Sequence, residues 1–224
     1  NILIKIEENG FEAYLVGGFV RDYLLHRDTN DFDIATNAKP KDITYIFGPS
    51  KKECEYGSFH MKLDSYNIDI TTYRREINVK SRTQFQMEYT TNMIFDAERR
   101  DFTINAIYMN KNGEILDPLE SIKDIQSKKV KMIGNPRVRL QEDPLRILRA
   151  VRFASTYSLK IDKNLIKAIK KEKQNLTLLS KERIKQELDL ILLAGGFRLL
   201  KDLDLLDVLG IKNKKIVYVK KEIR

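Results

Sequence analysis

The stretch that decides the fold is LVGGFVRDYLL at residues 15–25, which is followed by NDFDIAT at residues 30–36. In the first, an apolar strand runs into two glycines and then into the start of a helix. Glycine lets backbone N–H groups approach a phosphate, and a helix N-terminus adds partial positive charge. We therefore expect Gly17 and Gly18 to bind phosphate. Arg21, one helical turn further on, is expected to reach a phosphate oxygen.

Two aspartates in the second stretch indicate a metal site. Asp31 and Asp33 are spaced i, i+2 on a predicted strand, so their side chains point to the same face. Carboxylates about 5 Å apart repel each other by roughly 3 kcal/mol at an effective dielectric near 20. A divalent cation removes this cost, and hard oxygen ligands suit Mg²⁺. Asp69, on another predicted strand, offers a third carboxylate to one or two Mg²⁺ ions.

Two further clusters carry candidate binding residues. RRDFTINA at residues 99–106 places two arginines and Asn105 beside an apolar strand, where they suit sugar and phosphate or form a surface salt-bridge patch. EDPLRILRAVRF at residues 142–153 starts a helix, with Asp143 as N-cap and Pro144 at the first position. On its wheel Asp143, Arg146 and Arg149 lie opposite the apolar arc, with Arg152 at the margin. Asp143 beside Arg146 can read a base edge, and the later arginines can meet phosphates.

Hydrophobic periodicity divides the chain into an α/β part and a helical part. Before about residue 134 we predict helices at 2–9, 20–25 and 41–47 and strands at 12–16, 32–35, 53–63, 67–73, 104–109 and 114–116, with a mobile polar loop at 74–91. Beyond it we predict helices at 144–153, 164–173, 181–193 and 197–205. The predicted domains are therefore a head at 1–134, a helical neck at 135–195 and the start of a helical body at 196–224.

The charge of the chain is unevenly distributed. The 224 residues carry a formal net charge of +9, but residues 1–134 carry −2 and residues 135–224 carry +11. A basic second part favours an anionic partner such as RNA, although a solvated set of Lys-rich helices has the same composition. Cys54 is the single cysteine, which fits a reducing compartment, and no apolar run is long enough to span a membrane. We therefore expect a cytoplasmic protein without a membrane partner.

At these motifs the sequence closely resembles the class II tRNA nucleotidyltransferases and bacterial poly(A) polymerases, members of the DNA polymerase beta-like nucleotidyltransferase superfamily. The matching stretches occur in the family's order and cover roughly residues 10–195: LVGGFVRDYLL, NDFDIAT, RRDFTINAIYMN, EDPLRILRAVRFA and SKERIKQEL. The resemblance implies an α+β fold, in which a nucleotidyltransferase head with a small mixed sheet precedes an all-α neck and the start of a body. It also implies that family members continue well past residue 224.

The resemblance assigns roles to individual residues. Asp31 and Asp33 match the metal-binding pair and Asp69 matches the third catalytic carboxylate, while Gly18 and Arg21 match triphosphate-binding positions. Arg100 matches a nucleotide-binding arginine, Asp143 and Arg146 match the pair that reads the incoming base, and Arg149 and Arg152 match further nucleotide contacts. The implied reaction adds C, C and A to the 3′ end of tRNA from CTP and ATP with Mg²⁺, without a nucleic-acid template. The expected partners are therefore tRNA, CTP and ATP, with no obligate protein partner.

Three alternatives remain open at this point. A bacterial poly(A) polymerase shares the motifs but typically carries a basic strand before the third carboxylate, and ECEYGSFHMKLD at residues 53–64 is not basic. Partial enzymes add only CC or only A. The loop at 74–91 argues mildly against CC-only addition, because such enzymes tend to lack part of it. A non-catalytic RNA- or nucleotide-binding regulator would be expected to lose a metal carboxylate.

The family's Phe-Gly-Gly after an Asp-Pro is replaced by Leu119-Glu120-Ser121, so a glycine hinge there is stiffer or lies elsewhere.

Overall fold

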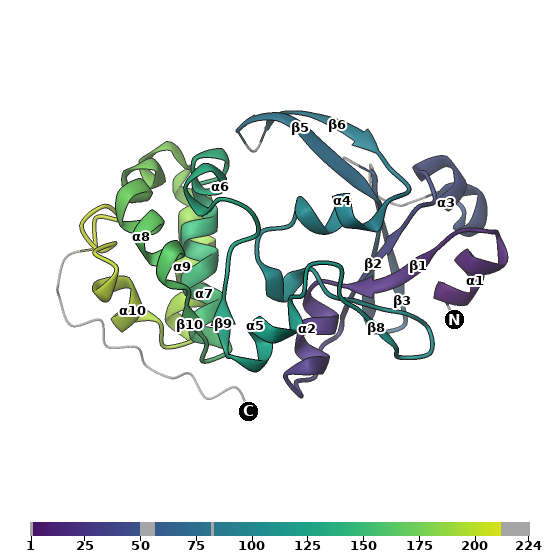
Figure 1. Ribbon diagram of the computed structural model, residues 1–224, viewed down its shortest axis with the longest axis horizontal. Helices are drawn as coiled ribbons and strands as arrows, with labels where there is room; N and C mark the ends of the chain where they lie inside the picture. The colour runs from purple at the N-terminus through teal and green to yellow at the C-terminus, as the bar shows by residue number, and fades with distance from the viewer. Residues whose placement is uncertain (1, 50–56, 82, 212–224) are drawn as a thin grey trace.

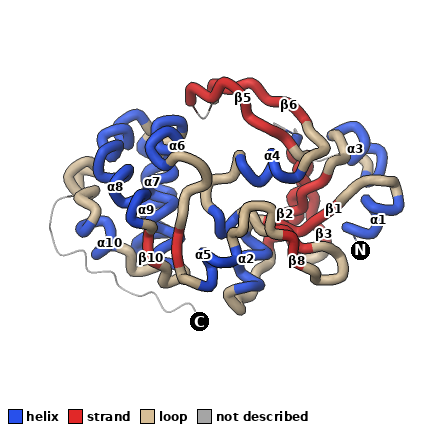
Figure 2. The backbone as a smooth tube through the Cα atoms, viewed as in Figure 1, coloured by secondary structure: helices blue, strands red, loops and turns tan. Residues whose placement is uncertain are grey.

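The computed structural model describes residues 2–49, 57–81 and 83–211, and its α+β architecture agrees with the sequence prediction. The head holds the main sheet, of strand order β3-β4-β2-β1-β7-β8 (Figures 1 and 2). Its strands are β1 (Ala13–Val16), β2 (Asp31–Thr36), β3 (Ser58–Leu63), β4 (Tyr66–Thr72), β7 (Tyr108–Met109) and β8 (Ile115–Leu116). The sheet is mixed, because β2 pairs parallel with β4 whereas its other pairings are antiparallel.

Two helices cover one face of this sheet, α1 (Ile2–Glu8) and α3 (Pro40–Phe47). Leu3, Ile6 and Ile43 from these helices form one buried cluster with apolar side chains of β2, β3 and β4. Ile34 belongs to that cluster, and successive residues of a strand alternate between faces. Asp33 therefore points to the opposite face, which is the face that builds the site.

The segment at 74–91 was predicted to be a mobile loop, and this prediction is wrong. It forms an antiparallel pair of strands, β5 (Arg74–Ser81) and β6 (Gln84–Tyr89), which arches from the head toward the neck (Figure 1). Arg75 and Glu88 pair across it at 2.7 Å. Half-buried and exposed residues alternate along much of both strands. In β6, Phe85, Met87 and Tyr89 alternate with polar residues, so the sequence carried a period-two strand signal that the prediction overlooked.

Smaller differences concern short elements in the head. The strand predicted at 104–109 is a 3₁₀ turn, Thr103–Asn105, followed by the two-residue strand β7. The strand predicted at 53–63 begins at Ser58, and residues 53–56 of that prediction lie outside the described residues. Helix α2 spans Gly18–Leu24 and so begins two residues before the helix predicted at 20–25. The helices α4 (Met93–Glu98) and α5 (Ile122–Gln126) were not predicted. Helices of five or six residues leave too few turns for a period to be read.

The second part is helical, as predicted, with one small exception. It contains α6 (Pro136–Glu142), α7 (Leu145–Thr156), α8 (Lys163–Glu172), the 3₁₀ segment Lys173–Leu178, α9 (Lys181–Leu193) and α10 (Phe197–Asp202). The exception is β10 (Lys160–Ile161), which pairs parallel with β9 (Lys129–Val130). Helix α6 was not predicted. No helix within the described ranges is long and apolar enough to cross a membrane.

The head and the helical part share one hydrophobic core. Its largest buried cluster joins Phe102, Ile104 and Ile107 of the head to Leu148 and Phe153 of α7. The Phe102 and Phe153 rings meet edge to face with their centroids 5.6 Å apart. Backbone hydrogen bonds from Thr103 to Lys131 and from Ile133 to Asp101 tie the connecting segment to the same region. The two parts are therefore expected to unfold together.

Replacing Phe102 by alanine tests this shared core. Phe102 is fully buried, so Phe102→Ala should lower the free energy of unfolding by about 3–5 kcal/mol while leaving a single thermal transition. Tyr45→Ala is the control, because Tyr45 is 86% exposed and its loss should change stability by about 0.5 kcal/mol or less. Calorimetry measures both. Two separate transitions, with only one displaced by Phe102→Ala, would show that head and helices have independent cores.

Candidate active site

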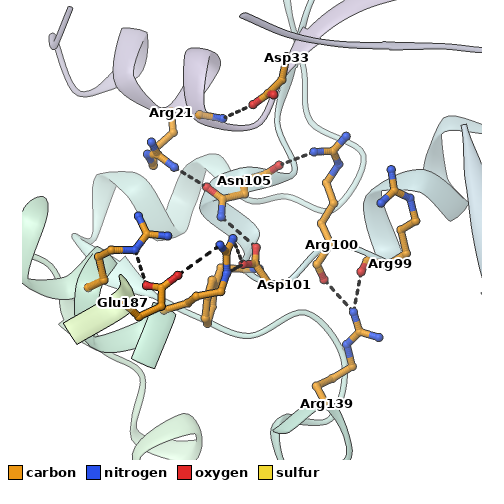
Figure 3. Close-up of polar contacts among 12 residues, drawn as sticks. Arg21, Asp33, Arg99, Arg100, Asp101, Asn105, Arg139 and Glu187 are labelled. Carbon is orange, nitrogen blue, oxygen red and sulfur yellow. Dashed lines mark hydrogen bonds and ion pairs between the residues drawn. The ribbon is translucent and has the colours of Figure 1, made fainter. Parts of the chain in front are cut away.

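The turn between β1 and α2 places backbone against the carboxylate of Asp33. Gly17 has φ 69° and ψ −129°, a conformation that side chains disfavour. A Cβ on Gly17 would lie 2.8 Å from Asp33 Oδ2 and 3.6 Å from an Arg100 Nη1. The backbone N–H of Gly18 donates to Asp33 Oδ2 at 3.3 Å (Figure 3). Glycine is thus required here by both conformation and space.

The three predicted carboxylates lie on one face of adjacent strands. The parallel pairing of β2 and β4 sets Asp33 opposite Asp69 and Asp31 opposite Asn67. Asn67 Nδ2 donates to Asp31 Oδ1 at 3.1 Å, and His60 Nδ1 lies in hydrogen-bond contact with Asp69 Oδ1. All three aspartates line one cavity, together with Gly18 and Arg21. The sheet register therefore brings together residues that are 36 positions apart in sequence.

The carboxylates of the described residues do not by themselves form a complete metal site. Within the described ranges, no group of three or more His, Cys, Asp or Glu side chains is arranged to hold a metal. Burial raises the pKa of Asp33, the guanidinium of Arg100 opposes that rise, and Asp69 adds to it. The carboxylate is thus held in a setting that favours an additional positive charge.

A second cavity, of about 580 Å³, lies on the other side of Asp33. Nine of the other predicted site residues line it with Asp33: Gly17, Gly18, Arg21, Arg100, Asn105, Asp143, Arg146, Arg149 and Arg152. Asp31 and Asp69 line the first cavity instead, and Asp33, Gly18 and Arg21 line both. The head supplies one wall and helix α7 with the end of α6 supplies the other. The structure thus gathers the predicted residues, while their roles stay predictions.

Arg100 is fixed by a buried carboxylate that the sequence reasoning missed. Asp96 on α4 is fully buried, and its Oδ2 accepts from Arg100 Nη2 at 2.9 Å and from the Tyr108 hydroxyl at 2.8 Å. Its Oδ1 accepts from Arg99 Nε at 2.9 Å. Burial alone would raise the pKa of Asp96, but Arg100 and Arg99 outweigh it and lower the pKa to about 2. The i, i+3 and i, i+4 spacing to the two arginines was the signal that could have revealed Asp96.

Arg21 bridges the head and the helical part. Its guanidinium donates to Asn105 Oδ1 at 2.8 Å and to the Tyr157 hydroxyl at 2.5 Å, and it pairs with Asp22 at 2.9 Å. It also lies over the Phe153 and Tyr157 rings. Arg21 is buried, so part of its predicted phosphate-binding capacity is used in holding α2 against α7. No local pattern marks Tyr157, which is 136 positions away.

A chain of polar contacts continues from Asn105 into the neck (Figure 3). Asn105 Nδ2 donates to Asp101 Oδ1 at 2.9 Å, and Arg149 Nε donates to Asp101 Oδ2 at 2.7 Å. On the far side, Arg152 Nε donates to Glu187 Oε2 of α9 at 2.7 Å. Asp101 and Glu187 thus hold two of the predicted nucleotide-binding arginines of α7 in place. Glu187 lies within the SKERIKQEL stretch that the sequence analysis singled out, but its role in holding Arg152 was not predicted.

The base-reading candidates lie where α6 gives way to α7. Asp143 is buried and its Oδ1 accepts from the backbone N–H of Leu145 at 3.2 Å. It is the C-cap of α6, and the N-cap of α7 is Pro144, one residue later than predicted. Arg146 Nη1 donates to Glu142 Oε2 at 3.2 Å and to the carbonyl of Arg139 at 2.9 Å. Both side chains line the cavity, together with Phe85 of the β5–β6 pair. Donors and acceptors therefore meet in the wall that the neck supplies to the cavity.

The fold and this site define a nucleotidyltransferase head. Residues 13–131 match the family described as the poly A polymerase head domain, and residues 158–211 match the family described as the probable RNA and SrmB-binding site of polymerase A. The first match covers more than half of the chain, which therefore belongs to the poly A polymerase head domain family.

Named relatives agree with this assignment. The chain is 40% identical over 194 residues to the CCA-adding enzyme of Limosilactobacillus reuteri, a match that covers 86% of this chain and 48% of that protein. It is 38% identical over 202 residues to the CCA-adding enzyme of Lactococcus lactis, covering 88% and 50%. The chain spans about half the length of the curated relatives it matches.

Solved structures show the same fold. The Bacillus stearothermophilus CCA-adding enzyme in complex with CTP superposes with a TM-score of 0.80 at 31% identity, covering 95% of this chain and 51% of that one. A tRNA nucleotidyltransferase complexed with a primer tRNA and an incoming ATP analog gives a TM-score of 0.77 at 27% identity, covering 93% and 62%. These neighbours share the fold of the helical part as well as that of the head.

Adding a methyl group at Gly17 should damage the site through a direct clash. Gly17→Ala would set its Cβ against Asp33, and we expect at least a ten-fold loss of affinity for inorganic tripolyphosphate, about 1.4 kcal/mol or more. Gly10→Ala is the matched control, because Gly10 also has a positive φ but has open space around its Cβ position. Titration calorimetry of both variants gives the comparison. Equal loss in the two would mean that the clash with Asp33 is irrelevant.

Acid should remove the stability that Asp96 provides. Its folded-state pKa of about 2 lies below the ordinary 3.8, so its contribution is complete above pH 5 and is lost as pH falls from about 4 to 2. The difference between these two pKa values corresponds to about 2 kcal/mol of folding free energy. Asp96→Asn should therefore flatten the acid side of the stability profile, measured by urea unfolding between pH 3 and 7. Asp28→Asn, at an exposed aspartate, is the control; an unchanged profile in Asp96→Asn would contradict the assignment.

Proposed function

We propose that this chain carries the catalytic part of a CCA-adding tRNA nucleotidyltransferase, which adds C, C and A to the 3′ end of tRNA from CTP and ATP. The observation that carries the proposal is the pairing of Asp33 with Asp69 beside the glycine turn, with Asp33 lining an arginine-rich cavity that Asp143 and Arg146 also line. The names of the relatives and structural neighbours support the same reaction.

The two cavities suggest how the substrates are divided. Seven arginines line the 580 Å³ cavity, so it suits the triphosphate of CTP or ATP. The adjoining cavity, lined by Asp31, Asp33 and Asp69, suits the 3′-hydroxyl of the RNA that attacks the α-phosphate. Asp33 borders both and lies where the two substrates meet. Holding them in line would lower the barrier by positioning, and the arginines would stabilise the pyrophosphate that leaves.

Magnesium fits the donor set, although the specific ion is part of the proposal. Asp31 and Asp33 would hold Mg²⁺ through hard carboxylate oxygens, with Asp69 as the third catalytic carboxylate. Such ions are usually bound by one or two carboxylates plus substrate phosphates, so a complete protein cage is not needed beforehand. When bound, the ion would supply positive charge to the hydroxyl and to the phosphates.

Base selection would come from the neck. Asp143 offers acceptors and Arg146 offers donors, so together they suit the mixed pattern on the edges of C and A. A base with the wrong pattern leaves a buried polar group unmet at a cost of about 1–3 kcal/mol. Gly17, Gly18, Arg21, Arg100 and Asn105 would hold phosphates and sugar, and Arg149 and Arg152 would make further nucleotide contacts.

The proposed domain division supports this assignment of tasks. The head at 1–134 would carry catalysis, the neck at 135–195 base recognition, and the segment from 196 the start of an RNA-binding body. The +11 charge of residues 135–224 and the RNA-binding family match at 158–211 support tRNA contact there. The single cysteine supports a cytoplasmic location.

The rival functions differ in their products. A poly(A) polymerase would add a long A-tract to unrelated RNA, and partial enzymes would add only CC or only A. A regulator would bind without extending the RNA. The β5–β6 pair lines the nucleotide cavity through Arg74, Glu76 and Phe85, which favours an enzyme that adjusts its pocket between C and A.

A primer-extension assay tests the proposal. With Mg²⁺, CTP and ATP, the protein should extend a tRNA lacking CCA by three nucleotides, and by two with CTP alone. Asp33→Asn should reduce the rate by about 1,000-fold or more, since a group that positions both reactants is lost. Asp64→Asn, at an exposed aspartate, is the control. Long A-tracts on unrelated RNA would instead indicate a poly(A) polymerase, and binding without extension would indicate a regulator.

A further inference from the structure

We propose that Arg139 is a positioning residue that sets the base-reading pair against the phosphate-binding end of the cavity, and thereby controls which base is accepted. The inference rests on the proposed function, because it concerns the selection of CTP and ATP. Arg139 lies on α6, in the segment that connects head and neck. Among the described residues, the cavity lining includes Glu142, Asp143 and Arg146 but stops short of Arg139, which acts from behind its wall.

The side chain of Arg139 forms hydrogen bonds with the backbone of the head. Its Nη2 donates to the carbonyl of Arg99 at 2.6 Å and to the carbonyl of Arg100 at 3.0 Å (Figure 3). The guanidinium groups of the same two residues are held by Asp96 and line the cavity. Arg139 therefore binds the backbone of the head's phosphate-binding arginine, whereas Asp96 binds its side chain.

The other contacts of Arg139 lead to the base-reading pair. Its Nη1 donates to Glu142 Oε2 at 2.9 Å, and the same oxygen accepts from Arg146 Nη1 at 3.2 Å. The carbonyl of Arg139 accepts from Arg146 Nη1 at 2.9 Å and from the backbone N–H of Asp143 at 3.3 Å. One residue is thus bonded to Arg100 on one side and to both base-reading residues on the other.

Arginine suits this place better than lysine. Its planar guanidinium presents several donors in a fixed fork, so one side chain reaches two carbonyls and a carboxylate at once. Lysine would keep the charge with a single mobile ammonium. Arg139 is largely buried, and Glu142 compensates its charge. These contacts hold Asp143 and Arg146 in a fixed position relative to Arg100, so their donors and acceptors meet the edge of the base in one orientation.

Removing the side chain should therefore affect the two ends of the nucleotide differently. In this proposal Arg100 and the glycine turn of the head hold the triphosphate. Arg139 contacts only the backbone of Arg100, whose side chain is held by Asp96. The base is read by residues whose placement depends on Arg139. Selectivity between bases should fall while affinity for the triphosphate alone stays nearly constant. A purely structural role would weaken both together.

Titration calorimetry with Mg²⁺ and without RNA tests this, using CTP, ATP, UTP and inorganic tripolyphosphate. In Arg139→Met the preference for CTP over UTP should fall about ten-fold or more, with the tripolyphosphate Kd within about two-fold of wild type. Arg137→Met is the matched control, because Arg137 lies on the same helix but is exposed and pairs with Glu172 of α8 within the neck. It should leave selectivity unchanged.

Arg139→Lys guards against a folding defect. It keeps the charge but not the fork, so it should also lose selectivity, and thermal unfolding would report its stability. Unchanged CTP preference in a folded Arg139 variant overturns the inference, as does equal loss of CTP and tripolyphosphate affinity. A wild-type chain without preference among the nucleotides would instead overturn the proposed base-reading function. The two failures are thus distinguishable.

Discussion

Like-charge repulsion is the constraint on which this structure depends. Seven arginines line one cavity, and each must keep its place against the others. Buried or half-buried carboxylates make this possible: Asp96 holds Arg99 and Arg100, Asp101 holds Arg149, Glu142 holds Arg146, and Glu187 holds Arg152. Breaking such a buried pair typically costs about 3–5 kcal/mol, because it leaves a charge without its partner. Asp96 and Glu187 lie outside the cavity lining, whereas Asp101 and Glu142 line it beside their arginines, and the seven arginines leave the cavity rich in donors for a polyanion.

The same arrangement unites the head with the helices that follow. Carboxylates of the head serve arginines of the neck, as in Asp101 with Arg149, and a tyrosine of the neck accepts from Arg21 of the head. The buried cluster around Phe102 and Phe153 runs in parallel with these polar contacts. Charge compensation and apolar burial thus act across one boundary. A nucleotide that spans the cavity would touch both parts at once.

The sequence predicted those features whose signals are local. The glycine turn, the i, i+2 aspartates and the Asp-Pro helix start each depend on residues within a few positions, and the structure contains all three. Asp96 was missed although its spacing to Arg99 and Arg100 was readable, because α4 was not predicted. Tyr157 and the role of Glu187 depend on contacts over 136 and 35 positions, which no local pattern contains. The strands β5 and β6 were missed although Phe85, Met87 and Tyr89 alternate with polar residues, because the many charged and amide side chains of the segment favour a loop.

The edges of β5 and β6 have a consequence for solubility. Among the described residues, β5 and β6 pair only with each other, so the outer edge of each strand carries backbone groups that another chain could pair with. Such edges promote aggregation when they are long, flat and apolar. Here charged residues such as Arg75 and Glu88 stand on the exposed faces, and the register shifts between Ile77 and Ser81. The charges on the exposed faces and the irregular register thus discourage these edges from pairing with a neighbouring molecule.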